Sequence, residues 1–236
     1  MPPPAAIQLA RVSRLYGSFV ALRDVSLALP AGSSVVRLGE NGAGKSTILK
    51  LVSGLASPSY GSVHVFGQPP RQQRGRIGTM GHAPMLYDEL TGLENLIYFA
   101  QLHGLATTRA ELAAIAAAAL ADVGLDPTLP RRVGDYSQGM KQRASLARVL
   151  MAQPALLLLD EPFSNLDIGS AHSMVERLLR YLAAPAADGT PRTLLMTTHQ
   201  AELARPLART TVTLAAGRIA SIAGDTSVTE AAEAIA

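Results

Sequence analysis

Cysteine and tryptophan are absent from the 236-residue sequence, and aromatic residues make up only 4% of it. Without cysteine the chain cannot form a disulfide, a thiolate metal site or a thiol nucleophile, so its chemistry must come from oxygen and nitrogen groups. Although 48% of the residues are hydrophobic, no run reaches the roughly 18 apolar residues that a membrane-spanning helix needs. Residues 1–4 also lack the basic region and apolar core that begin a signal peptide. We therefore expect a cytosolic chain.

Positive charge is only slightly in excess. The chain has 21 Lys and Arg against 18 Asp and Glu, a formal net charge of +3. Nucleic-acid binding needs basic residues gathered on one face, with aromatic side chains for single strands, whereas the basic residues here are spread along the chain. The densest basic segments, residues 71–76 and 131–132, are typical of a solvated surface. We therefore expect no nucleic-acid partner.

Short apolar runs alternate with helical patterns in both flanks of the chain. The run at 155–159 is apolar throughout, as a strand covered on both faces requires. This alternation predicts an α/β domain with a lateral antiparallel β part that begins at 7–29. Further strands are expected at 33–38, 62–66 and 193–198, a hairpin at 211–214 and 218–222, and helices at 44–53, 169–182 and 226–236.

Residues 84–150 differ from both flanks and are predicted to form a helical subdomain. Apolar residues recur at helical spacing in its first part, and Thr108 with Glu111 forms the capping box that opens an alanine-rich helix. Another helix is expected from Ser137 to about Ala152. Residues 1–236 are interpreted as a single domain that contains this subdomain.

A phosphate-binding pattern, G-x-x-x-x-G-K-S/T, is matched by Gly39-Glu40-Asn41-Gly42-Ala43-Gly44-Lys45-Ser46-Thr47. It lies between an expected strand and an expected helix, which is the context the pattern requires. The glycines let successive backbone N–H groups turn toward one concavity, and the helix adds its positive N-terminal end. Lys45 then reaches the β- and γ-phosphates, and the Ser46 hydroxyl ligates magnesium.

Two adjacent carboxylates end the apolar run. Asp160 follows the run directly, where it can hold a magnesium-bound water near Ser46, and Glu161 points the other way. Glu161 is thus placed to accept a proton from a water that attacks the γ-phosphate. These residues predict a nucleotide-hydrolysing site, and the lack of an N-K-x-D motif argues against a guanine nucleotide.

In their order along the chain, these motifs resemble those of the ATP-binding subunits of ABC transporters, and the resemblance covers nearly all of the sequence. Tyr16 resembles the aromatic residue that stacks on adenine, and His199 resembles the switch histidine. Two further segments resemble the family signature and the D-loop. They are Tyr136-Ser137-Gln138-Gly139-Met140-Lys141-Gln142-Arg143 for the signature and Ser164-Asn165-Leu166-Asp167 for the D-loop.

The resemblance implies the P-loop NTPase fold of an ABC nucleotide-binding domain and hydrolysis of Mg-ATP. Glu161 is then the base, His199 stabilises the γ-phosphate, and Lys45 with the loop amides holds the charge of the transition state. Ser46 and Asp160 are the expected magnesium ligands.

The resemblance also implies partners. Such subunits work as a head-to-tail pair, so a second copy or a related subunit is expected. In that pair Ser137, Gly139 and Asp167 contact the nucleotide of the other subunit. Transmembrane permease subunits are further expected partners, which implies a peripheral location at the cytoplasmic face of the membrane.

Several positions depart from the family pattern. The signature has Tyr136 in place of leucine, Gln138 in place of its first glycine and Met140 in place of its terminal glutamine. Arg37 lies in the strand before the phosphate loop, where the family is apolar. Because an unpaired buried charge is costly, we expect Arg37 to meet a carboxylate or carbonyl, or to point out of the core.

His82 stands where the family has a glutamine that senses magnesium and faces the membrane partner, so it is a further candidate metal ligand. With Leu93-Glu94-Asn95-Leu96 and Thr197-Thr198-His199-Gln200, it resembles the CcmA family, the ATP-binding subunits of the heme exporter of cytochrome c maturation. This resemblance implies heme export. An ABC-2 type exporter of drugs, lipids or polysaccharides is an alternative within transporters. An alternative of another class is a soluble ABC ATPase of DNA repair or translation, although the chain lacks the coiled-coil insertions and tandem domains of those proteins.

Overall fold

The main sheet of the protein has six strands in the order β5-β6-β7-β3-β8-β9. The computed structural model describes residues 5–39, 44–225 and 227–229, with only the backbone given for residues 37–39. The first five strands of the sheet are parallel, and β9 pairs antiparallel with β8 at its edge. The strands are β3 (Ser34–Gly39), β5 (Ile77–Met80), β6 (Leu156–Asp160), β7 (Thr193–Thr197), β8 (Thr210–Ala215) and β9 (Arg218–Gly224).

A second, antiparallel sheet has three strands in the order β2-β1-β4. They are β1 (Ala5–Tyr16), β2 (Phe19–Pro30) and β4 (Tyr60–Val65). Register shifts interrupt the pairing of β1 with both neighbours, as β-bulges do where a long strand bends. The expected lateral antiparallel part of the domain is confirmed.

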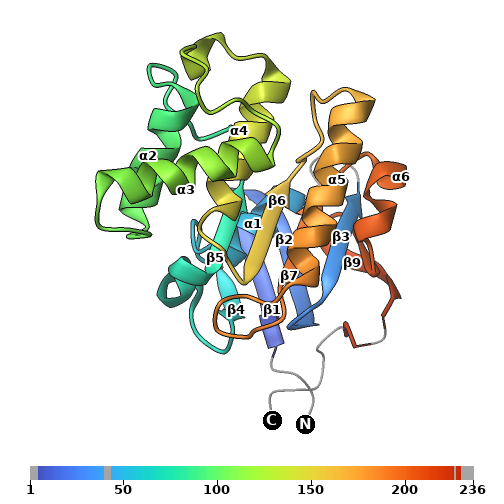
Figure 1. Cartoon of the computed structure of the whole chain (residues 1–236). Coiled ribbons are helices and arrows are strands. Elements are labelled where there is room, and N and C mark those ends of the chain that lie inside the picture. The colour runs from blue at the N-terminus through green and yellow to red at the C-terminus, as the bar shows by residue number, and fades with distance from the viewer. Residues whose placement is uncertain (1–4, 40–43, 226, 230–236) are drawn as a thin grey trace.

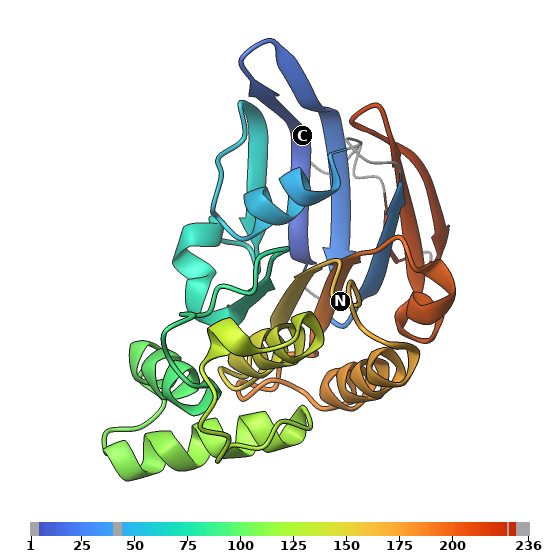
Figure 2. The ribbon, with the colours of Figure 1, turned by 90° about the horizontal axis from the view of Figure 1, so that it is seen from above.

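Helices cover the main sheet on both faces, as Figures 1 and 2 show. Helix α1 contacts β4 as well as β6 and β7, so it lies between the two sheets. The helices are α1 (Lys45–Val52), α2 (Gly92–Leu102), α3 (Arg109–Asp122), α4 (Gln138–Leu150), α5 (Ile168–Ala183) and the single turn α6 (Ala201–Ala204). Short 3-10 turns lie at Pro70–Arg76, Val133–Asp135 and Arg205–Leu207.

Strand β6 shows why the apolar runs lack alternation. Leu156 and Leu158 pack in the cluster that contains α1 and the antiparallel sheet, and Leu157 and Leu159 pack in the cluster formed with the helices α2 to α5. All four are fully buried, and each contributes about 1.5–3 kcal/mol by leaving water. The strand is therefore apolar on both faces, and the expected α/β class is confirmed.

Helices α2, α3 and α4 occur within residues 84–150 and lie together on one side of the molecule (Figure 1). Thr91 with Glu94 and Thr108 with Glu111 form complete capping boxes at the starts of α2 and α3. In the part of the chain that the structure describes, no helix combines the length and apolar character needed to cross a bilayer.

Some elements differ from their expected form. Strand β5 and the turn before it were not predicted, because Ile77-Gly78-Thr79-Met80 is short and contains glycine. The glycine is needed there: a methyl group at Gly78 would lie 2.6 Å from Pro154 Cγ and 2.8 Å from Val149 Cγ1. The helix expected at 226–236 lies outside the described residues.

Candidate functional site

Three parallel strands deliver the predicted catalytic residues to one edge of the main sheet. Strands β6 and β7 end in register, with Asp160 paired to Thr197, and β3 runs beside β7. Lys45 begins the helix after β3, Glu161 follows β6, and His199 follows β7 by two residues. Because carboxyl ends of parallel strands meet at one edge, these residues gather where α/β proteins bind ligands.

His199 contacts both Lys45 and Glu161. The Lys45 ammonium lies 3.0 Å from His199 Nε2, and His199 Nε2 lies 3.4 Å from Glu161 Oε1. The backbone N–H of His199 also donates to Glu161 Oε2 at 3.1 Å. Lys45 is only 8% exposed, so the cation is held below the surface beside an imidazole that itself contacts the Glu161 carboxylate.

The other carboxylate oxygen of Glu161 has free capacity. Oε1 is buried and accepts no hydrogen bond within the described part of the chain, because its contact with His199 lacks hydrogen-bond geometry. A buried acceptor without a donor is costly unless a water or ligand supplies one. An acceptor of this kind can take the proton of a bound water.

Asp160 is held by Thr197, a contact that the sequence did not predict. Thr197 Oγ1 donates to Asp160 Oδ1 at 2.5 Å, and Thr197 is fully buried. The available signal was the polar threonine that follows three apolar residues at the end of β7. This hydrogen bond fixes the carboxylate at the edge of the sheet.

The metal ligands expected from the sequence fit magnesium bound together with a nucleotide. The described residues contain no group of three or more His, Asp or Glu side chains that could hold an ion by themselves. Magnesium typically takes one or two protein oxygens and completes its shell with phosphates and water. The exposed Ser46, in the first turn of α1, and Asp160 supply oxygens of the required kind.

The phosphate loop is described at its two ends. Gly39 ends β3, and Gly44 precedes α1 with φ 93°. A methyl group at Gly44 would lie 2.5 Å from the Ala21 carbonyl oxygen and 2.7 Å from Leu22 Cδ2, so only glycine fits there. Thr47 is half-buried in the first turn of α1. The expectations for Glu40, Asn41, Gly42 and Ala43 lie outside the described residues.

Tyr16 lies at the tip of the β1–β2 hairpin, paired with Phe19. Tyr16 is 43% exposed, and the Arg14 guanidinium lies 4.6 Å from the centroid of its ring. Arg14 is itself anchored through a hydrogen bond to the Ser57 carbonyl oxygen. The exposed ring can stack on a flat base, as predicted for adenine.

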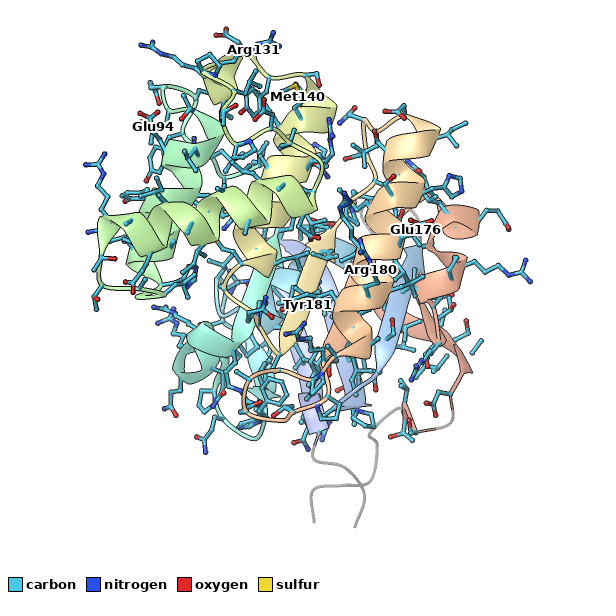
Figure 3. The ribbon with its side chains drawn as sticks, viewed as in Figure 1. Glu94, Arg131, Met140, Glu176, Arg180 and Tyr181 are labelled. Atoms are coloured by element: carbon cyan, nitrogen blue, oxygen red, sulfur yellow. The ribbon has the colours of Figure 1, made fainter. Side chains whose placement is uncertain are left out.

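The signature residues form the start of α4. Ser137 is the N-cap, and its Oγ accepts from the Met140 N–H at 3.2 Å. Gly139 lies in the first turn, where a methyl group would lie 3.5 Å from Leu166 Cδ2 of the predicted D-loop. Figure 3 shows Met140 at the upper end of α4. Ser137 and Gln138 are exposed there, so a second molecule can reach them.

Asp167 has a local role in addition to the predicted one. It is the N-cap of α5, with Oδ1 accepting from the Ser170 N–H and Oδ2 from the Ser170 hydroxyl. These hydrogen bonds, first that of the hydroxyl, lower the pKa of the Asp167 carboxyl. The side chain is exposed beside α5.

Tyr136 and Arg37 both depart from the family pattern, and the structure describes the side chain of Tyr136 only. Tyr136 is buried, and its hydroxyl fits against the start of α2 because Gly92 has no side chain: a methyl group there would lie 2.7 Å from that hydroxyl. Burial raises the pKa of Tyr136. The side chain of Arg37 lies outside the described residues, so its predicted partner stays a prediction.

His82 follows the edge strand β5 and is exposed. Strand β5 pairs with β6 up to Met80 and Leu159, so His82 and Asp160 come from neighbouring strand ends. Among the described residues, no hydrogen bond joins His82 to Asp160 or Glu161. Its role as a metal ligand stays a prediction.

Comparison with known proteins identifies the family. The family model of the ABC transporter matches residues 22–164. The Nod factor export ATP-binding protein I of Rhizobium johnstonii is 39% identical over 219 residues, which cover 91% of this chain and 68% of that protein. The ABC transporter ATP-binding protein NatA of Bacillus subtilis is 35% identical over 207 residues, covering 84% and 80%.

Solved structures agree with this result. An ATP-binding subunit of an ABC transporter matches with a TM-score of 0.80 and 29% identity, over 93% of this chain and 90% of that one. A dimeric ATP-binding cassette in a post-hydrolysis state, bound to ADP and Pi, matches in fold with a TM-score of 0.82 and 24% identity, over 92% and 98%. The chain belongs to the ABC transporter family of ATP-binding domains. It is an ATPase of the ABC class, and the predicted fold is confirmed.

Proposed function

We propose that this chain is the ATP-hydrolysing subunit of an ABC exporter and that Glu161 is its general base. The observation that carries the proposal is the contact of Glu161 with His199 and of His199 with Lys45 at the carboxyl edge of the sheet. A base, a cation and a linking imidazole in contact are the groups that phosphoryl transfer to water requires.

The reaction follows from what each residue can do. Lys45 and the N-terminal end of α1 attract the phosphates of ATP. Glu161 Oε1 accepts a proton from the water that attacks the γ-phosphate. The hydrogen bond from the backbone N–H of His199 to Oε2 fixes the direction of the carboxylate. His199 then lies between the base and the cation, where it stabilises charge that develops on the γ-phosphate.

Ser46 and Asp160 would hold magnesium, and His82 is a further candidate. Bound there, the ion neutralises part of the negative charge of the phosphates. Thr197 keeps one oxygen of Asp160 occupied, which leaves the other for the ion or its water. Tyr16 stacks on the adenine.

The active form is a head-to-tail pair, with a second copy or a related subunit. The exposed position of Ser137 at the start of α4 supports contact with a nucleotide held by the other subunit. Gly139 and Asp167 belong to the same surface, where Gly139 approaches Leu166. The helical subdomain of residues 84–150, within one domain spanning 1–236, carries Ser137 and Gly139 of this surface, and the start of α5 carries Asp167.

Transport is proposed through separate membrane permease subunits, with this chain bound peripherally at the cytoplasmic face. The relatives named above are called Nod factor export and NatA proteins, and they favour an ABC-2 type exporter. Heme export for cytochrome c biogenesis remains the more specific prediction from His82, and the names of those relatives do not support it. Co-purification with membrane subunits, followed by their identification, separates the two cargo classes.

Nucleotide binding tests the basis of the proposal. Lys45→Ala removes the cation from the phosphate site, and we expect loss of tight ATP binding in a titration with a fluorescent ATP analogue. Lys50→Ala, in the same helix but exposed, is the matched control. Wild-type affinity in Lys45→Ala contradicts the assignment of the loop.

A further inference from the structure

The backbone of Glu161 adopts a conformation that glutamate disfavours. Its φ is 52°, in the left-handed region where a side chain crowds the backbone. Such a conformation persists only where surrounding contacts hold it, and it occurs often at functional sites. The contacts that hold Glu161 therefore decide where its carboxylate points.

One of those contacts comes from the signature helix. The Gln142 side-chain amide donates from Nε2 to the Pro162 carbonyl oxygen at 2.9 Å and lies 3.3 Å from the Glu161 carbonyl oxygen. Gln142 is only 6% exposed. A single amide group thus binds two consecutive carbonyls, those of the peptide groups before and after Pro162.

Ser164 and Thr197 also hold the backbone of Glu161. Ser164 donates to the same Glu161 carbonyl oxygen from Oγ at 2.9 Å and from its backbone N–H at 3.1 Å. The Glu161 N–H donates to the Thr197 carbonyl oxygen at 3.0 Å. Ser164 and Thr197 come from the loop after β6 and from the neighbouring strand, so Gln142 supplies the contact from a helix.

We propose that Gln142 is a positioning residue that holds the strained Glu161 backbone so that the carboxylate faces His199 and the attacking water. The inference rests on the proposed function, in which Glu161 is the general base. Gln142 belongs to α4, whose N-terminal end carries Ser137 and Gly139. The helix that presents the signature to the other subunit thereby also sets the base of its own subunit.

Ser145 offers a matched control on the same helix. It is fully buried, and its Oγ donates to the Pro84 carbonyl oxygen at 2.9 Å. Ser145→Ala therefore removes a buried side-chain hydrogen bond of α4 without changing a contact to Glu161. Gln142→Met keeps the length and burial of the side chain and removes the donor.

The test measures steady-state ATPase and nucleotide affinity on the purified full chain. We expect Gln142→Met to lower kcat by about tenfold to a hundredfold, the range for a small displacement of a catalytic group. ATP affinity stays close to wild type, because the contact lies behind the base and away from the phosphates. Ser145→Ala keeps a kcat close to wild type. The inference is overturned if kcat in Gln142→Met is as high as in Ser145→Ala. It is also overturned if Gln142→Met loses ATP affinity by as large a factor as it loses kcat.

Combination with Glu161→Gln separates positioning from a general structural role. If Gln142 acts through Glu161, adding Gln142→Met to Glu161→Gln does not further lower the residual rate in single-turnover hydrolysis. A further drop of the size seen in the wild-type background overturns the inference. If Glu161→Gln alone keeps wild-type activity, the proposed base is wrong. If Gln142→Met keeps wild-type activity and Glu161→Gln loses it, the proposed function stands and this inference fails.

Should Gln142→Met not fold, Ser164→Ala tests the same carbonyl from a half-buried loop position. We expect a lower kcat with unchanged ATP affinity. An unchanged kcat in this variant contradicts the claim that holding the Glu161 carbonyl positions the base.

Discussion

The charged groups at the site are arranged around the His199 ring. One ring nitrogen lies 3.0 Å from the Lys45 ammonium and 3.4 Å from Glu161 Oε1. An imidazole between a base and a cation can exchange contacts with both as charge moves during hydrolysis. This arrangement accounts for a histidine at position 199, two residues after β7, where an apolar side chain could not link the base and the cation.

The Thr197 side chain orients Asp160, a predicted magnesium ligand, through a hydrogen bond. Thr197→Val removes the hydroxyl that donates to Asp160 Oδ1 and keeps the shape of the side chain. A hydrogen bond to a charged group contributes about 1.5–3 kcal/mol, so the magnesium concentration for half-maximal ATPase should rise by about tenfold or more. Titration of the rate with magnesium at constant ATP measures this shift.

Thr213→Val is the control. Thr213 is half-buried in β8, and β3 separates this strand from β7, which carries Thr197. The same magnesium dependence in both variants would remove Thr197 from the account of the site.

At the scale of elements, the fit between the signature loop and α2 depends on a pair of residues. The Tyr136 hydroxyl occupies the space that a side chain at position 92 would need. Since the family has leucine at the signature position, the larger Tyr136 and the side-chain-free Gly92 accommodate each other. The helical group thus keeps its packing despite the unusual signature residue.

Gly92→Ala tests this pairing. Its methyl group would lie 2.7 Å from the Tyr136 hydroxyl, and overpacking of this kind costs about 1–3 kcal/mol of unfolding free energy. Denaturant unfolding should show the loss, and the Tyr136→Leu background should remove most of it. An equal loss in both backgrounds would mean that the two residues are not coupled.

The capping boxes of α2 and α3 predict a dependence of stability on acid. Hydrogen bonds to the Thr91 backbone and side chain lower the pKa of Glu94, and bonds to the Thr108 side chain and backbone lower the pKa of Glu111. A carboxyl with a lowered folded-state pKa adds stability that is complete above its ordinary pKa of 4.5. That stability is lost as the pH falls through the lowered value.

The unfolding free energy of the wild type should therefore decrease below about pH 4.5 more steeply than that of Glu111→Gln. Glu176→Gln, at an exposed position of α5 (Figure 3), is the control and should follow the wild type. Parallel curves for all three proteins would show that the cap adds no charge-dependent stability.

At the scale of the whole molecule, local patterns predicted most of the fold. The four leucines of β6, the capping box at Thr108 and the glycine-rich loop before α1 each carry their structure in a few consecutive residues. Strand β5 was missed because its four residues gain strand form only by pairing with β6. Its glycine is explained by packing against Pro154, which the sequence alone does not show.

The candidate site was predicted to the same extent and for the same reason. Lys45, Glu161 and His199 each follow a recognisable strand, so their positions could be foreseen. The contacts of Gln142 and Thr197 could not be foreseen, because they join each residue to backbone or side-chain atoms far along the chain. The positive φ of Glu161 is likewise a property of the folded chain and not of the residue.

The central claim is that Glu161 is the general base of the ATPase: hydrolysis depends on it, and nucleotide binding does not. Glu161→Gln keeps the size of the side chain and removes its capacity to take a proton. The phosphate-release rate at saturating Mg-ATP should fall by about a hundredfold or more, while ATP binding persists because Lys45 and the phosphate loop are unchanged. A phosphate-release rate equal to that of the wild type would contradict the account.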